Sequence, residues 1–158
     1  MKAVLGLGTN IGDRMQNLED ALTALALLPN TEILKKSSVY ETKPYGYTEQ
    51  ADFLNMAVEI NTDFPPEGLL GACLGIEAAL GRVRLFKNGP RIIDLDILLV
   101  EHFSSDTSFL RVPHPEIQNR SFVLQPLYDL FPSGVAYAYD FSKAYRQQDL
   151  SDIQKYIP

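Results

Sequence analysis

The stretch that most constrains the fold is residues 92–100, an apolar run that is interrupted only by Asp94 and Asp96. Its aliphatic and β-branched residues predict a strand. Because side chains alternate between the two faces of a strand, both carboxylates lie on one face, roughly 6.5–7 Å apart along the chain. Carboxylates on an otherwise apolar strand require a cation or several hydrogen bonds. The run therefore predicts a strand with an acidic site on one face, unless that pair simply faces water.

A basic segment leads directly into this strand. Residues 82–91 contain Arg82, Arg84, Lys87 and Arg91 and no acid, in a chain whose net charge is −6. Mg²⁺ takes oxygen ligands and commonly shares them with substrate phosphates, while guanidinium groups bind phosphate as a fork. Acids and bases side by side thus indicate a polyphosphate site. The competing interpretation is a solvated loop beside a strand end.

Composition limits the class of protein. The chain of 158 residues is expected to form one domain, residues 1–158, with its own core. The acidic balance argues against nucleic-acid binding, which needs a basic face. A single cysteine, Cys73, lies in a helical pattern among leucines and is predicted to be a core residue in a reducing compartment. The sequence has no signal-peptide pattern and no apolar run of membrane-spanning length, so we expect a cytoplasmic protein without membrane contact.

Apolar periodicity predicts the order of elements. The expected strands are Lys2–Leu7, Glu32–Thr42, Phe53–Thr62 and Ile92–Val100, and the expected helices run from Asp13 to Leu28 and from Pro66 to Leu80. A further helical stretch, 115–128, is expected to break at Pro126, and 131–158 to form a strand or turn before a terminal helix. The order β-α-β-β-α-β predicts an α+β, ferredoxin-like sandwich with an antiparallel sheet, both main helices on one face and a C-terminal extension. The other face would be free for the loops to form a cleft.

Several polar residues have two interpretations. Glu77 lies on the apolar stripe of its helix, where it would form a helix-end salt bridge or position the arginine loop. His114, between two prolines, and Arg120 would be structural or would contact a phosphate chain. The stretch Gly6-Leu7-Gly8-Thr9-Asn10 lacks the Walker ending and is interpreted as a turn that packs the first strand against the helix.

Aromatic residues offer a surface for a flat ring. Phe53, Phe122 and Tyr45 are candidates for stacking on a heterocycle, although aromatic residues on strands commonly belong to the core. Asn55 shares a strand face with Phe53, and its amide both donates and accepts hydrogen bonds, which suits the edge of a pterin or a purine.

Taken together, these stretches resemble the 6-hydroxymethyl-7,8-dihydropterin pyrophosphokinase family of folate synthesis. The similarity spans about residues 3–132 in uninterrupted order. The motifs that carry it are Gly6–Asp13, Ser38–Gly46, Phe53–Asn55, Gly81–Arg84, Gly89–Leu99, Val112–Pro115 and Asn119–Val123.

The resemblance implies transfer of the terminal pyrophosphoryl group of ATP to a pterin hydroxymethyl group, with release of AMP. It implies two Mg²⁺ ions held by Asp94 and Asp96, and charge stabilisation by Arg82 and Arg91. The residues implied to bind ATP are Glu77, Arg84, Ile97, His114 and Arg120. Those implied to bind the pterin are Thr42, Pro44, Tyr45, Phe53, Asn55 and Phe122. The expected partners are these two small molecules alone, bound by a monomer.

Two other classes fit parts of the sequence. A glycosyltransferase would use Asp94-Leu95-Asp96 to hold a metal-bound sugar nucleotide, but such enzymes usually need a larger nucleotide-binding domain than this chain supplies. A regulatory ferredoxin-like module would bind a ligand without catalysis. Such a module would have no reason to place two aspartates beside four cationic side chains.

Overall fold

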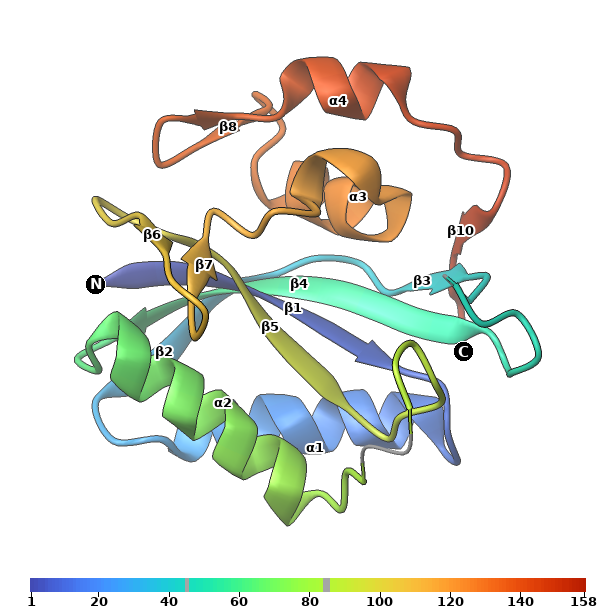
Figure 1. Ribbon diagram of the computed structural model, residues 1–158, viewed down its shortest axis with the longest axis horizontal. Coiled ribbons are helices and arrows are strands. Elements are labelled where there is room, and N and C mark those ends of the chain that lie inside the picture. Colours follow the sequence, from blue (N-terminus) through green and yellow to red (C-terminus); the bar gives the residue numbers. More distant parts are fainter. Residues whose placement is uncertain (45, 84–85) are drawn as a thin grey trace.

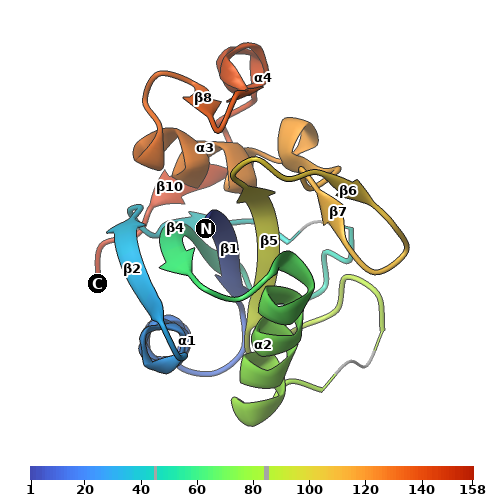
Figure 2. The same ribbon diagram turned by 90° about the vertical axis from the view of Figure 1, so that its left-hand side faces the viewer.

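The protein is an α+β sandwich whose sheet lies between two layers of helices (Figures 1 and 2). The computed structural model describes residues 1–44, 46–83 and 86–158. Helices α1 (Arg14–Leu27) and α2 (Pro66–Ala79) cover one face of the sheet. The opposite face is covered by α3 (Ser121–Leu130), with α4 (Ser142–Gln147) packed outside it. The predicted ferredoxin-like α+β class is confirmed, but the expectation of a fully free second face is wrong.

The sheet is antiparallel, with strand order β10-β3-β4-β1-β5 and β2 paired to the other end of β4. Its strands are β1 (Lys2–Thr9), β2 (Thr31–Lys36), β3 (Tyr40–Thr42), β4 (Phe53–Thr62), β5 (Asp94–Val100) and β10 (Ile153–Lys155). The smaller elements are β6 (Ser105–Asp106), β7 (Arg111–Val112), the 3₁₀ turn η1 (Ile117–Asn119), β8 (Val135–Ala136) and β9 (Tyr139–Asp140). Within the described ranges, no helix has the length and apolarity needed to cross a membrane.

Local signals explain both long helices. The Asp13 side chain accepts a hydrogen bond from the Gln16 backbone N–H (3.1 Å), which caps α1 as the capping-box spacing predicts. Pro66 opens α2, where its missing N–H has no helical partner to lose. Gly81, with φ of 92°, ends this helix in the left-handed conformation that glycine adopts most readily.

The core divides between the two faces of the sheet. On β4, alternate residues Leu54, Met56, Val58 and Ile60 face α1 and α2. The larger core, on that side, also contains Cys73, which is fully buried. Burial, then the charges of Glu77 and Asp96, raises the pKa of the Cys73 thiol to about 12, so this cysteine is the inert core residue that its helical position predicts.

The predicted strand 32–42 is two strands, separated at residues 37–39. The Ala57 backbone N–H donates to the Ser37 hydroxyl (2.9 Å) instead of to a backbone carbonyl, which interrupts the pairing with β4 at the point between β2 and β3. The strand pattern of the sequence does not reveal that a side chain replaces a backbone acceptor at this point.

Three further expectations need correction. The helical stretch breaks at Arg120, between η1 and α3, and Pro126 lies inside α3, where only one backbone bond is lost. Gly6 and Gly8 are not part of a turn, because β1 continues through them to Thr9. The tail does contain a helix, α4, but it continues into β10, which joins the main sheet.

Candidate active site

Two cavities meet at the end of β5 where the acidic pair begins. The first cavity lies between the sheet and α3, and Asp96 belongs to the walls of both. Predicted site residues that line the first cavity are Thr42, Phe53, Asn55, Arg91, Asp94, Asp96, Arg120 and Phe122. The second cavity is formed by α2, β5 and the β6–β7 hairpin, and its predicted site residues are Asp96, Ile97 and His114.

Asp94 is held by both predicted catalytic arginines. Arg82 Nη1 lies 2.7 Å from Asp94 Oδ1, and Arg91 Nη1 lies 3.1 Å from Asp94 Oδ2. Although burial opposes it, the carboxylates of Asp94 and Glu77 raise the pKa of Arg82, so its guanidinium stays charged. A basic segment and an acidic strand that are adjacent in sequence therefore also form one charge cluster in space.

Glu77 supports this cluster from behind. Its Oε2 atom accepts hydrogen bonds from Arg82 Nη1 and from the Leu95 backbone N–H, both at 2.8 Å. The Glu77 side chain is 5% exposed and that of Arg82 is 9% exposed. The two interpretations of Glu77 thus coincide, because the salt bridge at the helix end is itself the contact that orients Arg82.

Asp96 has a different environment from Asp94. Burial, then the charges of Asp94 and Glu77, raises the pKa of Asp96 to about 7, while Arg120 and Arg82 partly oppose this shift. Within the described part of the chain, the Asp96 carboxylate has no hydrogen bond or ion pair. Asp96 therefore lies in the walls of both cavities, and no described cationic side chain is in direct contact with its carboxylate.

The acidic pair fits a hard divalent cation that shares its coordination with a ligand. No group of three or more His, Cys, Asp or Glu side chains suited to a metal occurs among the residues that the structure describes. Mg²⁺ does not need such a group, since it is commonly held by one or two carboxylates together with substrate phosphates. A carboxylate has about four lone-pair positions, so Asp94 retains acceptor capacity beside its two arginines.

One end of the first cavity suits a flat, hydrogen-bonding ring. Asn55 Nδ2 donates to Thr42 Oγ1 (2.7 Å), and both residues are buried. This bond leaves the side-chain amide oxygen of Asn55, Oδ1, for a ligand. Phe53 and Phe122 line the same cavity from β4 and α3. Each also contacts a cation, with the Arg91 guanidinium carbon 5.4 Å from the Phe53 ring and that of Arg120 5.5 Å from the Phe122 ring.

His114 lies in the wall of the second cavity in its neutral form. Its Nδ1 atom accepts the Glu116 backbone N–H (3.1 Å), so the neutral ring carries its proton on Nε2. Burial, followed by the charge of Arg120, lowers the pKa of His114, which favours this form. The ring is therefore a hydrogen-bond donor toward the cavity at neutral pH.

Some predicted residues lie elsewhere. Tyr45 and Arg84 fall outside the described residues. Pro44 is half-buried at the start of the 43–50 loop and is not part of either cavity wall. Glu77 lies behind the walls, as described above.

The structure adds residues that sequence reasoning missed. Asn10 donates to Gln50 Oε1 (2.8 Å) and accepts from the Arg91 backbone N–H (2.9 Å), so it joins the 43–50 loop to the end of the arginine segment. Gly8 forms part of the cavity floor, and a Cβ atom there would lie 2.9 Å from Asn55 Oδ1. Glycine inside a strand often marks a close approach of this kind, and that signal was available in the sequence. No spacing rule points to Asn10.

An acidic pair held beside two arginines, with Asp96 in the walls of two cavities, is the arrangement of a transferase that acts on phosphate groups. Comparison with known proteins gives the family. Residues 4–132 match the family described as 7,8-dihydro-6-hydroxymethylpterin-pyrophosphokinase (HPPK). The chain belongs to this family.

Individual relatives agree with this assignment. The chain is 43% identical over 154 residues to a 2-amino-4-hydroxy-6-hydroxymethyldihydropteridine pyrophosphokinase from Methylorubrum extorquens, with 98% of each chain covered. The protein of the same name from Bacillus subtilis is 48% identical over 128 residues, covering 81% of this chain and 77% of that one. Among solved structures, a Plasmodium falciparum HPPK-DHPS protein has a TM-score of 0.67 at 16% identity, over 92% of this chain and 45% of that one, which supports the fold alone.

Proposed function

We propose that the two joined cavities are where this pyrophosphokinase transfers pyrophosphate from ATP to 6-hydroxymethyl-7,8-dihydropterin in folate biosynthesis. Membership of the family gives the reaction. The observation that supports its location is that Asp96 lies in the walls of both cavities, beside the cluster of Asp94, Arg82 and Arg91. One cavity suits the flat pterin and the other the nucleotide, so the reacting groups would meet at the charges.

The first cavity supplies groups for the pterin. The rings of Phe53 and Phe122 would stack on its two faces, and the Asn55 carbonyl oxygen would accept a hydrogen bond from its edge. Thr42 fixes the orientation of the Asn55 amide through the 2.7 Å bond. Tyr45 and Pro44, at the adjoining loop, stay predicted contacts.

The second cavity supplies groups for the nucleotide. Ile97 offers an apolar wall, and His114 would donate from Nε2 to a phosphate oxygen. Arg120, which lines the first cavity, would bind the phosphate chain from that side. Arg84 stays a predicted contact. For Glu77, which lies behind the wall, we propose that it acts through Arg82 and does not touch the nucleotide.

The reaction balances as one displacement. The pterin hydroxymethyl oxygen bonds to the β-phosphorus of ATP, the bond from that phosphorus to the bridging oxygen of the α-phosphate breaks, and AMP leaves. Arg82 and Arg91 would stabilise the charge that moves between the attacking and leaving oxygens. Asp94 and Asp96 would hold two Mg²⁺ ions, which supply neutralisation of the phosphate charge when bound. A loose transition state requires no strong base, and the hydroxyl proton would leave to solvent.

The reaction is tested by incubating the protein with ATP, Mg²⁺ and 6-hydroxymethyl-7,8-dihydropterin and resolving AMP from ADP. We expect one AMP for each pterin pyrophosphate formed, with loss of turnover in EDTA and recovery on addition of Mg²⁺. ADP as product would contradict the proposed displacement. Binding of ATP without turnover would favour the regulatory-module alternative. A monomer in the cytoplasm stays the predicted state of the protein.

The cavity floor gives a second test. Gly8→Ala places a methyl group 2.9 Å from Asn55 Oδ1, closer than real contacts allow, so Asn55 must move and its bond to Thr42 is strained. We expect the KM for the pterin to rise on the order of tenfold, with little change for ATP, because one oriented hydrogen bond is weakened.

Gly71→Ala is the matched control. It lies on the exposed side of α2, where an added Cβ meets nothing within 4 Å. This variant should keep both KM values and gain slightly in stability, because alanine is the better helix former. Equal pterin KM values for the two variants would argue against Asn55 as a pterin contact.

A further inference from the structure

The segment after α4 extends the sheet next to the strand that carries Thr42. Strand β10 pairs with β3 in the register Ile153 to Thr42, Gln154 to Glu41 and Lys155 to Tyr40 (Figure 1). The family match ends at residue 132, so this strand lies outside the part of the chain that defines the family. Without β10, the three-residue strand β3 would be held on one side only, by β4.

Two backbone hydrogen bonds flank the paired residues of β3 and β10. The Lys43 N–H donates to the Asp152 carbonyl (3.4 Å), and the Tyr156 N–H donates to the Val39 carbonyl (2.8 Å). Because bonded and non-bonded pairs alternate in an antiparallel ladder, the bonded pair between these two contacts is Gln154 with Glu41. Ile153 and Lys155 occupy non-bonded positions, so their N–H groups point away from β3.

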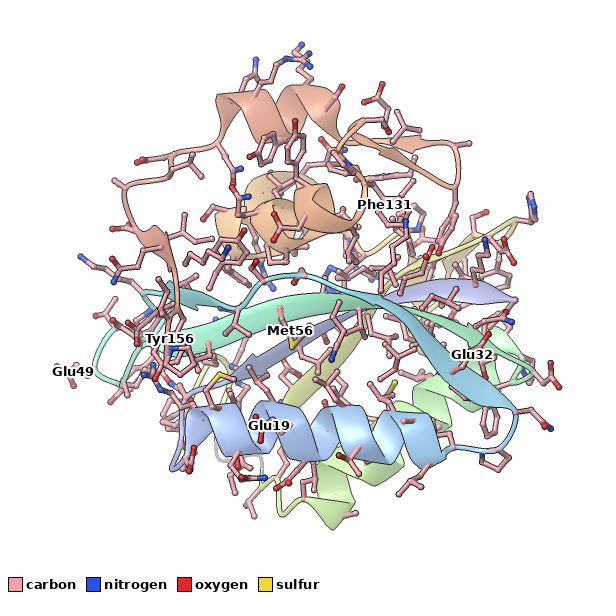
Figure 3. All side chains as sticks on the ribbon, turned by 180° about the vertical axis from the view of Figure 1, so that it is seen from behind. Glu19, Glu32, Glu49, Met56, Phe131 and Tyr156 are labelled. Carbon is pink, nitrogen blue, oxygen red and sulfur yellow. The ribbon has the colours of Figure 1, made fainter. Side chains whose placement is uncertain are left out.

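Side chains fasten both ends of the added strand. At one end, Lys43 Nζ lies 3.6 Å from Asp152 Oδ1. At the other, Tyr156 packs against the larger core, with its ring 5.6 Å from the guanidinium carbon of Arg14. Arg14 in turn forms a 2.6 Å ion pair with Glu41 of β3. Figure 3 shows Tyr156 at the edge of the sheet near α1, where these contacts meet.

These contacts lead to the first cavity and not to the second. Thr42, the last residue of β3, accepts the hydrogen bond that orients Asn55, and Lys43 after it lines the cavity. The second cavity is built from α2, β5 and the β6–β7 hairpin, whereas β10 pairs with β3 at the opposite edge of the sheet.

We infer that β10 is a positioning element for the pterin end of the site, which fixes Thr42 and through it Asn55. The inference rests on the proposed function, since it takes the first cavity as the pterin site. Its consequence is selective: disturbing β10 weakens pterin binding and leaves ATP binding intact. A strand that only stabilised the fold would not distinguish the two ligands.

The test compares two proline variants of the full chain. Gln154→Pro removes the N–H of the bonded pair, while Lys155→Pro removes one that points away from β3. Binding of 6-hydroxymethyl-7,8-dihydropterin and of the α,β-methylene analogue of ATP with Mg²⁺ is measured separately by calorimetry. We expect the pterin Kd to rise on the order of tenfold in Gln154→Pro alone, with the analogue Kd within about twofold in both variants.

Amide hydrogen exchange gives a second measurement on the same proteins. Exchange in residues 39–43 should be faster in Gln154→Pro than in Lys155→Pro. If Gln154→Pro does not fold, Tyr156→Ala should weaken pterin binding and Tyr156→Phe, which keeps the ring over Arg14, should restore it.

Equal losses for both ligands, or no loss of pterin affinity in Gln154→Pro and Tyr156→Ala, would overturn the inference. A wild-type protein that does not bind the pterin at all would instead overturn the proposed function, so the two failures are distinguishable.

Discussion

Asp96→Asn should abolish turnover while leaving the protein at least as stable as the wild type. The substitution removes a charge that the proposed reaction needs for Mg²⁺, so kcat should fall on the order of 10³-fold or more. The same charge is buried beside Asp94 and Glu77, which raise the pKa of Asp96 to about 7. Because the ionised form is disfavoured in the folded state, a neutral amide of the same shape should not lower Tm at neutral pH.

Steady-state kinetics and thermal unfolding without added metal are the two measurements. Asp20→Asn is the control, because Asp20 is an exposed residue on α1 whose side chain accepts a hydrogen bond from the Gln16 side chain of the same helix. It should leave both quantities unchanged. Near-normal kcat in Asp96→Asn would remove Asp96 from the proposed mechanism.

Glu77→Ala should have the largest effect on stability among the site residues. It leaves the Arg82 guanidinium with one fewer anionic partner and the buried Leu95 N–H without its acceptor. Breaking one side of a buried ion pair costs about 3–5 kcal/mol, which corresponds to a fall in Tm of about 10 °C for a chain of this size. The kcat should fall as well, because Arg82 loses one of its two carboxylate contacts.

Glu77→Gln separates the two effects. Its amide oxygen still accepts from Leu95 N–H, so most of the stability should return, while the loss of charge still changes the orientation of Arg82. The comparison at an exposed position on the same helix is Glu67→Ala, which should change the free energy of unfolding by less than about 1 kcal/mol. Identical melting of Glu77→Ala and Glu67→Ala would mean that Glu77 does not support the site.

The sequence predicted those features that depend on local periodicity. Asp94 and Asp96 line one cavity because alternate residues of a strand share a face, and the same rule places Phe53 and Asn55 together. The helix limits followed from Asp13, Pro66 and Gly81, whose effects are local.

Features that depend on distant pairing were not predictable. Ile153-Gln154-Lys155 has no strong strand signal of its own, and it becomes a strand because β3 offers an unpaired edge. The break at Ser37 depends on Ala57, and Asn10 contacts Gln50 and Arg91 only once the two loops are in place. The packing of α3 on the second face of the sheet likewise depends on tertiary contacts and could not be predicted from local patterns.

The strand order has a consequence for how the chain folds. Strand β1 lies in the interior of the sheet, where Ala3 pairs with Ile60 on one side and with Val100 on the other. During synthesis, β1 is made well before β4 and β5, the two strands with which it pairs. Pairing over such long sequence distances makes folding slow relative to helical proteins. The chain must lose the entropy of closing a long loop before the strand contacts can form and stabilise it. Until Val100 has emerged, one edge of β1 is open, so a chain halted before that point would expose a long apolar strand to other chains.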